Sequence, residues 1–234
     1  MPSKPFLPKQ KSSNPLVPCR FGKISTLLFS LSGALLAAAA IAFGVIYGDG
    51  IKAAQDAQGL LLQYNSAEET IAEAATASAS PTNTVAGQTL TPTDEPKPEI
   101  VINGYPVMGT LQIEEIGLQL PIISNTDDEA LKTSICYYQG AIPPEKGLMV
   151  ITGHNYSSGA HFGQLDQLKK GNTVAFTAAD GTVYQYQVST IRSIKPNEPE
   201  VLEDYSGEYS LMLMTCTNHG NARLIVCCTG ANAN

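Results

Sequence analysis

An uncharged apolar run near the N-terminus constrains this chain more than any other feature. The run extends from Ile24 to Gly48 and contains 25 residues without a charged side chain. About 20 apolar residues in a helix span the hydrocarbon core of a bilayer, so the run predicts a transmembrane anchor over 24–48. A cleaved signal peptide is the alternative, since the Ala37–Ala40 stretch would suit cleavage, but signal-peptide cores are shorter, at about 7–15 residues.

The charges around this run predict its orientation. Residues 1–23 carry five basic side chains and no acidic one, and Lys23 and Asp49 flank the run. Because basic residues favour the cytoplasmic side, we expect a cytoplasmic basic N-terminus over 1–23 and a single-pass protein of the cell membrane. The rest of the chain holds nine basic and 21 acidic residues, a formal charge of −12. Such an acidic body argues against nucleic acid as a partner.

The segment that follows the apolar run is predicted to be a stalk over residues 49–98. Its first part is rich in Ala, Gln and Glu and has room for a short helix near the membrane. From Ser78 to Pro98, Thr, Ser and Pro dominate, and too few large apolar side chains remain to offset the entropy cost of ordering. We therefore expect a flexible linker there. Residues 99–234 are long enough for one hydrophobic core and are predicted to form an extracellular domain.

Short apolar runs separated by turns predict an all-β fold for this domain. Leu148–Thr152 is continuously apolar, as in a buried strand, and Thr182–Ile191 alternates with period two after an Asp180-Gly181 turn. One or two short helices are expected, over Asp127–Ser134 and Phe162–Lys169. About seven or eight short strands favour a closed barrel or a sandwich. The other expected strands are Met108–Glu114, Gly117–Ile123, Thr173–Thr177, Tyr209–Cys216 and Arg223–Thr229.

Three residues with reactive side chains stand at the ends of these strands. His154 follows one apolar strand, Cys216 ends another, and Arg223 opens the last. Antiparallel partners keep a constant index sum, so pairing Cys216 with Arg223 places both on one face at one end of the sheet. A thiol there can attack a carbonyl, a guanidinium can stabilise the oxyanion, and an imidazole can protonate a leaving amine.

The remaining histidines and cysteines are assigned structural roles. His161 is expected at the surface or as a cap, and His219 in a solvated turn. A zinc site built from His154, Cys216 and His219 is conceivable, because a Cys-x-x-His spacing can chelate zinc, but no metal and no cofactor is predicted. The cysteines that lie in apolar stretches are expected in the core: Cys136, Cys227 and Cys228.

The segments around these three residues resemble the sortases, the cysteine transpeptidases of Gram-positive bacterial surfaces. The resemblance covers roughly Tyr105 to Gly230. It rests on Thr152-Gly153-His154-Asn155, on Arg223, and on Leu213-Met214-Thr215-Cys216, which matches the family's Thr-Leu-x-Thr-Cys box except that Met212 replaces the first Thr. It implies an eight-stranded sortase-like β-barrel. The histidine segment and the single N-terminal anchor look closest to class B.

The resemblance also implies a reaction and its site. A sorting-signal peptide would acylate Cys216, and an amine acceptor such as a cell-wall precursor or a pilin would resolve the thioester. The implied catalytic residues are His154, Cys216 and Arg223, and Thr215 and Asn155 are expected to bind substrate.

Two other functions stay open at this point. One is a non-catalytic, membrane-anchored surface β-domain. The other is a different cysteine peptidase or transpeptidase, although an L,D-transpeptidase keeps its Arg two residues after the Cys, and here the offset is seven. The segment Ser193–Glu208 is expected to be a substrate-facing loop before the cysteine strand.

Overall fold

The computed structural model describes residues 22–77, 100–196, 205, 207–217 and 220–233. The predictions for residues 1–21, for the linker over 78–98, for His219 and for most of the substrate-facing loop lie outside the described residues. The chain divides into two compact units, Met1–Gly44 and Val45–Asn234. All the predicted catalytic residues belong to the second unit.

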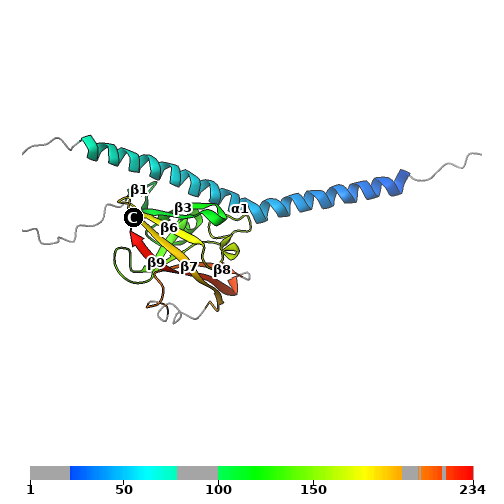
Figure 1. Cartoon of the computed structure of the whole chain (residues 1–234). Coiled ribbons are helices and arrows are strands. Elements are labelled where there is room, and N and C mark those ends of the chain that lie inside the picture. The colour runs from blue at the N-terminus through cyan, green and yellow to red at the C-terminus, as the bar shows by residue number, and fades with distance from the viewer. Residues whose placement is uncertain (1–21, 78–99, 197–204, 206, 218–219, 234) are drawn as a thin grey trace, which may run out of the picture. The chain divides into compact units, whose positions relative to one another are not determined.

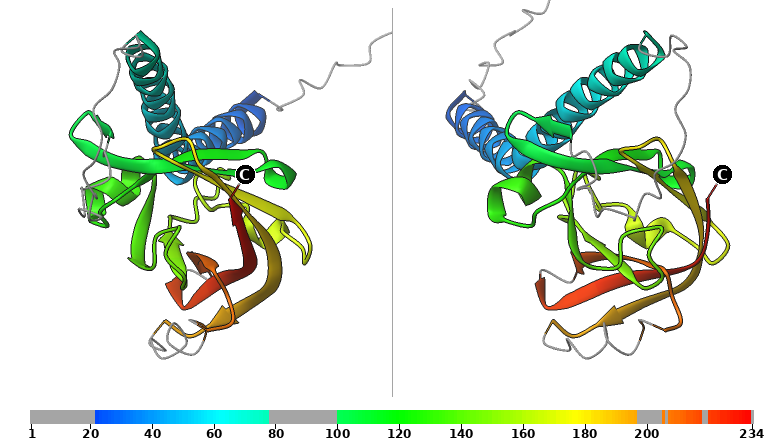
Figure 2. Two further views of the ribbon diagram at one scale, coloured as in Figure 1. Left: turned by 60° about the vertical axis from the view of Figure 1, so that its left-hand side comes forward. Right: turned by 90° about the vertical axis from the view of Figure 1, so that its left-hand side faces the viewer.

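Nine strands of the second unit form one sheet that closes on itself (Figures 1 and 2). They are β1 (Ile100–Ile102), β2 (Tyr105–Ile113), β3 (Leu118–Ile123), β4 (Ile135–Gly140), β5 (Met149–Thr152), β6 (Thr173–Ala178), β7 (Val183–Ile194), β8 (Leu211–Thr217) and β9 (Ala222–Ala233). Their order is β1-β2-β3-β4-β5-β8-β9-β7-β6, and a further pairing of β6 with β2 closes β2 to β9 into a barrel. The predicted eight-stranded β-barrel is confirmed, with β1 as a short addition to β2.

The short helices differ in part from the prediction. Helix α2 (Asp128–Thr133) forms as expected, because the Asp127 carboxylate accepts hydrogen bonds from the first backbone N–H groups of the helix. The second expected helix, over Phe162–Lys169, is only a single 3₁₀ turn, η2 (Leu165–Gln167). Leu165 and Leu168 are both buried, so a single turn is enough to place the apolar side chains of this segment in the core. The helix η1 (Glu114–Ile116) lies between β2 and β3.

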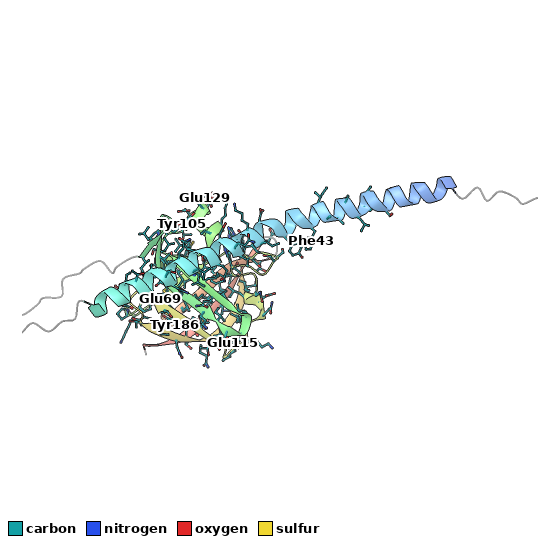
Figure 3. The ribbon with its side chains drawn as sticks, turned by 90° about the horizontal axis from the view of Figure 1, so that it is seen from above. Phe43, Glu69, Tyr105, Glu115, Glu129 and Tyr186 are labelled. Carbon is teal, nitrogen blue, oxygen red and sulfur yellow. The ribbon has the colours of Figure 1, made fainter. Side chains whose placement is uncertain are left out.

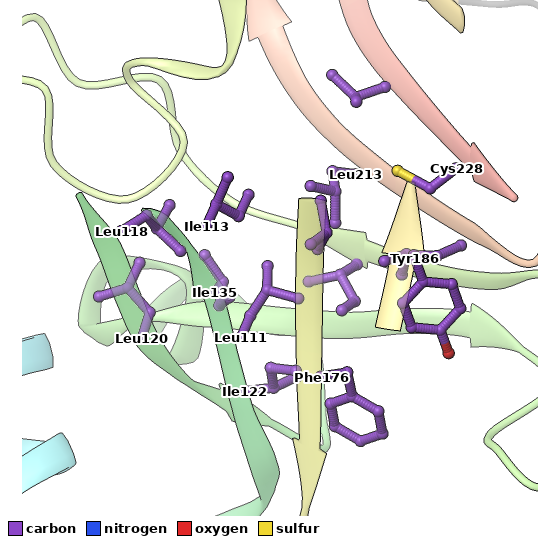
Figure 4. Packing of buried hydrophobic residues seen from close by; sticks show 14 of the residues in the cluster. Leu111, Ile113, Leu118, Leu120, Ile122, Ile135, Phe176, Tyr186, Leu213 and Cys228 are labelled. Atoms are coloured by element: carbon purple, nitrogen blue, oxygen red, sulfur yellow. The ribbon is translucent and has the colours of Figure 1, made fainter. Parts of the chain in front are cut away.

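Side chains from every wall of the barrel fill its interior. Along β7, Tyr184, Tyr186 and Val188 are buried while Gln185 and Gln187 are exposed, which confirms the predicted period of two. Figure 4 shows side chains of β2, β3, β6 and β7 meeting in this interior. Burying one large apolar side chain stabilises a fold by about 1.5–3 kcal/mol, so this cluster is the main source of the barrel's stability.

The N-terminal helix α1 (Gly22–Ala77) continues far beyond the apolar run, and its later part packs on the barrel (Figures 1 and 3). Ala53, Ala57, Leu60 and Tyr64 are at most 3% exposed. Their spacing places them on one helix face, and the last two pack against β1 and β2. The prediction of a stalk is therefore wrong for residues 49–77, because this face of the helix completes the hydrophobic core.

The apolar part of α1 has the composition of a membrane-spanning segment. Among the residues that the structure describes, α1 is the one helix long and apolar enough to cross a membrane, with a mean hydropathy of 1.9 in its most apolar stretch and none of that stretch buried. Its large side chains, such as Leu35, Leu36 and Phe43, are exposed. A continuous exposed apolar surface of this kind is unfavourable in water, which fits the transmembrane prediction.

Replacing Leu60 with Ala should destabilise the second unit. Leu60 is 2% exposed between α1 and the strands, and truncating a buried leucine costs about 2–5 kcal/mol. We expect the free energy of unfolding, measured by urea denaturation of the full chain in detergent micelles, to fall by that amount. Leu62→Ala is the matched control, because Leu62 is 66% exposed on the same helix; it should change stability by less than about 0.5 kcal/mol. Equal effects would contradict the packing of α1.

Candidate active site

Three neighbouring strands bring the predicted catalytic residues into one row. β5 and β8 run parallel with a constant index difference of 62, as in the pair Thr152 and Met214. Continuing this register past the end of β5 places His154 beside Cys216. On the other side of β8, Cys216 pairs with Arg223 of β9, which confirms the predicted index sum. Since neighbouring strands lie about 4.8 Å apart, the imidazole, the thiol and the guanidinium belong to adjacent positions of one sheet edge.

Hydrogen bonds hold the histidine segment against the cysteine strand. The Thr215 hydroxyl donates to the Gly153 carbonyl at 2.7 Å, and the Asn155 side-chain amide donates to the Cys216 carbonyl at 2.8 Å. Thr215 is 1% exposed and does not line the cleft described next. In the structure, Thr215 and Asn155 therefore position His154 relative to Cys216, and a contact of either residue with substrate stays a prediction.

A cleft of about 310 Å³ opens over the row and is lined by all three predicted catalytic residues. Cys216 is exposed, and His154 and Arg223 are half-buried. The rest of the lining comes from α2 and the residue Thr126 before it, from β4, from the end of β5, from β8, and from the end of β7 with the segment after it. Ile194, Lys195 and Pro196 belong to the start of the predicted substrate-facing loop. The contributions of α2 and β4 were not predicted from the sequence, because only the pairing of β4 with β5 shows that β4 borders the site. Its apolar members are Leu131, Tyr138, Ile194 and Met214.

The environment of His154 favours its neutral form. Burial is the largest influence and lowers the pKa of the imidazole; the positive charge of Lys132 lowers it further, while the negative charge of Asp128 raises it. Both charged residues lie on α2, which therefore tunes the protonation of the histidine. At neutral pH the resting imidazole is mainly uncharged and able to accept a proton.

The other described cysteines are structural, as predicted. Cys136, Cys227 and Cys228 are free and buried, whereas Cys216 is free and exposed. Burial raises the pKa of Cys136 to about 12 and that of Cys227 to about 11, and it also raises the pKa of Cys228. Since the thiolate is the nucleophile, these three thiols are inert at neutral pH. Cys216 is the described cysteine that a substrate can reach.

The prediction that His161 lies at the surface is wrong. The residue is 4% exposed, and neither ring nitrogen makes a hydrogen bond within the described structure. Its backbone adopts a left-handed conformation with φ of 51°, which histidine tolerates better than most residues. This turn directs the ring inward, toward backbone groups of Ala53 on α1 and Thr133 at the end of α2. Burial lowers the pKa of His161 to about 4.

His161 should make the protein less stable in mild acid. The folded chain keeps the imidazole neutral down to about pH 4, whereas an unfolded histidine binds a proton near pH 6.5. Between these values the unfolded state binds more protons, so the free energy of unfolding falls as the pH falls, by an amount of order 3 kcal/mol from this group. His161→Asn removes the titration and keeps a residue that tolerates positive φ. Urea denaturation between pH 7 and pH 4.5 should show a shallower pH dependence for that variant, and identical slopes would contradict the buried placement.

Metal binding finds no support in the described part of the chain. Among those residues, no three histidine, cysteine or carboxylate side chains gather closely enough to hold a metal ion. The zinc alternative also requires His219, which lies outside the described residues.

Comparison with known proteins identifies the family. The family model of the sortase domain matches residues 111–231, more than half of the chain, and this match contains His154, Cys216 and Arg223. The chain belongs to the sortase family. The family fold agrees with the closed barrel described above.

Individual sortases are similar over the same part of the chain. Sortase A of Bacillus anthracis is 27% identical over 113 residues, which cover 48% of this chain and 53% of that protein. Sortase A of Streptococcus agalactiae is 29% identical over 138 residues, covering 53% of each protein. A solved lid mutant of sortase A from Corynebacterium diphtheriae gives a TM-score of 0.50 at 25% identity, covering 56% of this chain and 73% of that one. The chain spans about half the length of the curated relatives it matches, and the class B resemblance stays a prediction.

Proposed function

We propose that this sortase is a membrane-anchored cysteine transpeptidase that cleaves a sorting-signal peptide and transfers its acyl group to an amine. The observation that carries the proposal is that His154, two residues past the end of β5, and the paired residues Cys216 of β8 and Arg223 of β9 all line one cleft. A nucleophile, a proton-transfer group and a fixed cation are the three functions that acyl transfer through a thioester requires.

In the first half-reaction, Cys216 gives its thiol proton to His154, and its sulfur attacks the carbonyl carbon of the scissile peptide bond. A carbon–sulfur bond forms, and the carbonyl oxygen becomes an oxyanion that the guanidinium of Arg223 stabilises. The tetrahedral intermediate then collapses, the carbon–nitrogen bond breaks, and His154 gives its proton to the leaving amine. The products are a thioacyl-enzyme and the free C-terminal fragment.

In the second half-reaction, an acceptor amine attacks the thioester. His154, now neutral, takes the proton that the amine loses, and Arg223 again stabilises the oxyanion. The carbon–sulfur bond breaks, a new amide forms, and the proton returns to the sulfur of Cys216. Atoms and charge balance over the cycle as written.

Burial lowers the pKa of His154, which disfavours the imidazolium in the resting enzyme. The proton of Cys216 therefore passes to His154 mainly when substrate occupies the cleft and the sulfur attacks.

The apolar segment of α1 supports membrane attachment. We infer a single-pass anchor over residues 24–48 with a cytoplasmic N-terminus, because the flanking basic residues lie on that side. The catalytic unit then faces the outside of the cell membrane. There it would meet a sorting-signal peptide and an amine acceptor of the cell wall or of a pilus.

The full chain in detergent micelles provides the test. It is incubated with a library of sorting-signal-like peptides, with and without triglycine as the amine acceptor, and analysed by mass spectrometry. The proposal expects an acyl adduct on Cys216 that hydroxylamine removes, and a peptide–triglycine product. Absence of both across the library would favour the non-catalytic surface domain, and cleavage without transfer would favour a hydrolytic cysteine peptidase.

A further inference from the structure

The ring of Tyr156 lies between the rings of two histidines. Its centroid is 5.3 Å from that of His154 at an interplanar angle of 62°, and 5.2 Å from that of His161 at 77°. Both contacts have the edge-to-face geometry that aromatic rings prefer. His154 lines the cleft and His161 is buried, so Tyr156 contacts both the cleft and the interior of the protein.

The backbone around Tyr156 is tightly folded. The Gly159 N–H donates to the Tyr156 carbonyl at 2.9 Å, and the Phe162 N–H donates to the His154 carbonyl at 3.0 Å. A Cβ atom on Gly163 would lie 2.4 Å from the Tyr156 carbonyl oxygen. Residues 154–163 thus form a compact loop, here called the histidine loop, in which a shift of Tyr156 shifts His154 as well.

Helix α1 lies in close contact with the histidine loop. At Gly50 the helix approaches so closely that a Cβ atom would lie 2.1 Å from the Ser158 hydroxyl, 2.9 Å from the Ser158 Cβ and 3.1 Å from the Tyr156 Cβ. One turn further along, the backbone of Ala53 faces the buried ring of His161. The same helix therefore contacts the loop at two places, at Tyr156 and Ser158 and at His161, and a Cβ atom at position 50 would overlap Ser158.

We propose that Tyr156 is a positioning residue for the catalytic histidine and that α1, from Gly50 to Ala53, holds it in place. This inference rests on the proposed function. In this arrangement α1 contributes to catalysis, because α1 supports the ring of Tyr156 and the ring of Tyr156 orients that of His154. A barrel without α1 would keep Cys216 and Arg223 in register but leave the histidine loop without its support.

Charged groups of both helices surround this aromatic cluster. On α1, Asp49 acts on Tyr156 and Asp56 on His161. On α2, Asp128 and Lys132 act on His154. Burial is the largest influence on all three rings: it lowers the pKa of the two histidines and raises that of the tyrosine. Loss of the tyrosine ring should therefore expose His154 to water and raise its pKa toward the ordinary value.

The first test compares Tyr156→Ala with Tyr156→Phe in the full chain. The alanine variant should lower kcat/KM about tenfold or more through kcat, because misplacing a catalytic group by about 1 Å is that costly. The phenylalanine variant should stay within about twofold, since the edge contacts need the ring and not the hydroxyl. The chain has three histidines, so NMR titration of their ring protons reports the pKa of His154 directly, and it should rise in the alanine variant alone.

The second test separates the role of the helix from that of the tyrosine. Gly50→Ala forces α1 away from Ser158 and should lower kcat/KM about threefold or more with the same rise in the pKa of His154. Gly59→Ala is the matched control, because a Cβ there has no atom within 4 Å and the gain in helix propensity is the same. Adding Ser158→Gly to Gly50→Ala removes the two nearest atoms and should restore activity.

These outcomes distinguish the inference from the function on which it rests. If the unaltered chain forms no acyl adduct, the proposed function fails, and the NMR titration still measures whether Tyr156 and Gly50 control the environment of His154. If the unaltered chain is active and Tyr156→Ala matches Tyr156→Phe in both activity and titration, the positioning role is overturned. Equal behaviour of Gly50→Ala and Gly59→Ala would overturn the part played by α1.

Discussion

Replacing Cys216 with Ala should abolish both acyl-enzyme formation and transfer to an amine. The sulfur is the atom that bonds to the scissile carbon, and the three other described thiols are buried with raised pKa values, so none can take its place. We expect activity to fall to background in the peptide assay, with no adduct detected by mass spectrometry. An active Cys216→Ala variant would end the proposal of thioester chemistry.

The control for this variant is a second cysteine change that leaves the nucleophile in place. Cys136→Ala alters a thiol that packs beside α1, α2 and β2 and should retain acylation, with at most a modest loss of stability. Because Cys19 lies outside the described residues, both variants are best made in a Cys19→Ala background. A thiol-reactive reagent should then label one site per folded chain in the control and none in Cys216→Ala.

Replacing Arg223 with Ala should lower kcat/KM by about two to three orders of magnitude. Losing one group that stabilises an oxyanion typically has an effect of this size. The guanidinium pairs in register with Cys216, and its hydrogen bonds to the carbonyls of Gly220 and Ala222 are long, at 3.4 and 3.5 Å. Such weak bonds leave the group able to turn toward a substrate. Single-turnover measurement of acylation checks the prediction, since the loss should appear in that step.

Two further variants show whether the loss belongs to this position. Arg223→Lys keeps the charge but not the planar fork of donors, so it should recover part of the acylation rate. Arg192→Ala removes an exposed arginine of β7 that binds the Tyr205 hydroxyl and does not line the cleft, so it should stay within about twofold. Full activity of Arg223→Ala, or an equal loss in Arg192→Ala, would contradict the assigned role.

The hairpin of β8 and β9 could be predicted because its pairing is local. A short turn joins the two strands, the index sum follows from one assumed pair, and the structure reproduces the three pairs Cys216–Arg223, Met214–Ile225 and Met212–Cys227. The position of His154 is a different case. It depends on the parallel pairing of β5 with β8, strands some 60 residues apart, for which the local pattern indicates a strand end but not a partner.

Strand β4 and the burial of His161 were missed for the same reason, because both depend on residues distant in the chain. Burial along β4 changes once from buried to exposed, without the alternation that marks a strand, and its place is set by pairing with β3 and β5. His161 is polar and stands in a loop, and only its left-handed backbone and the cover of α1 and α2 make it a buried residue.

The sequence alone determined what depends on neighbouring residues. The length of the apolar run gave the N-terminal segment, the alternation with period two gave the β domain, and the short hairpin gave the pairing of Cys216 with Arg223. The folded protein decided what depends on distant partners. It closed the barrel and brought His154 to the cysteine. It also placed residues 49–77, which were predicted to be a stalk, in a helix that packs on the barrel and lies close to Ser158 and Tyr156. Two of the four buried side chains on this helix face are alanines, which bury little apolar area. The face became part of the core because Leu60 and Tyr64 pack against strands β1 and β2.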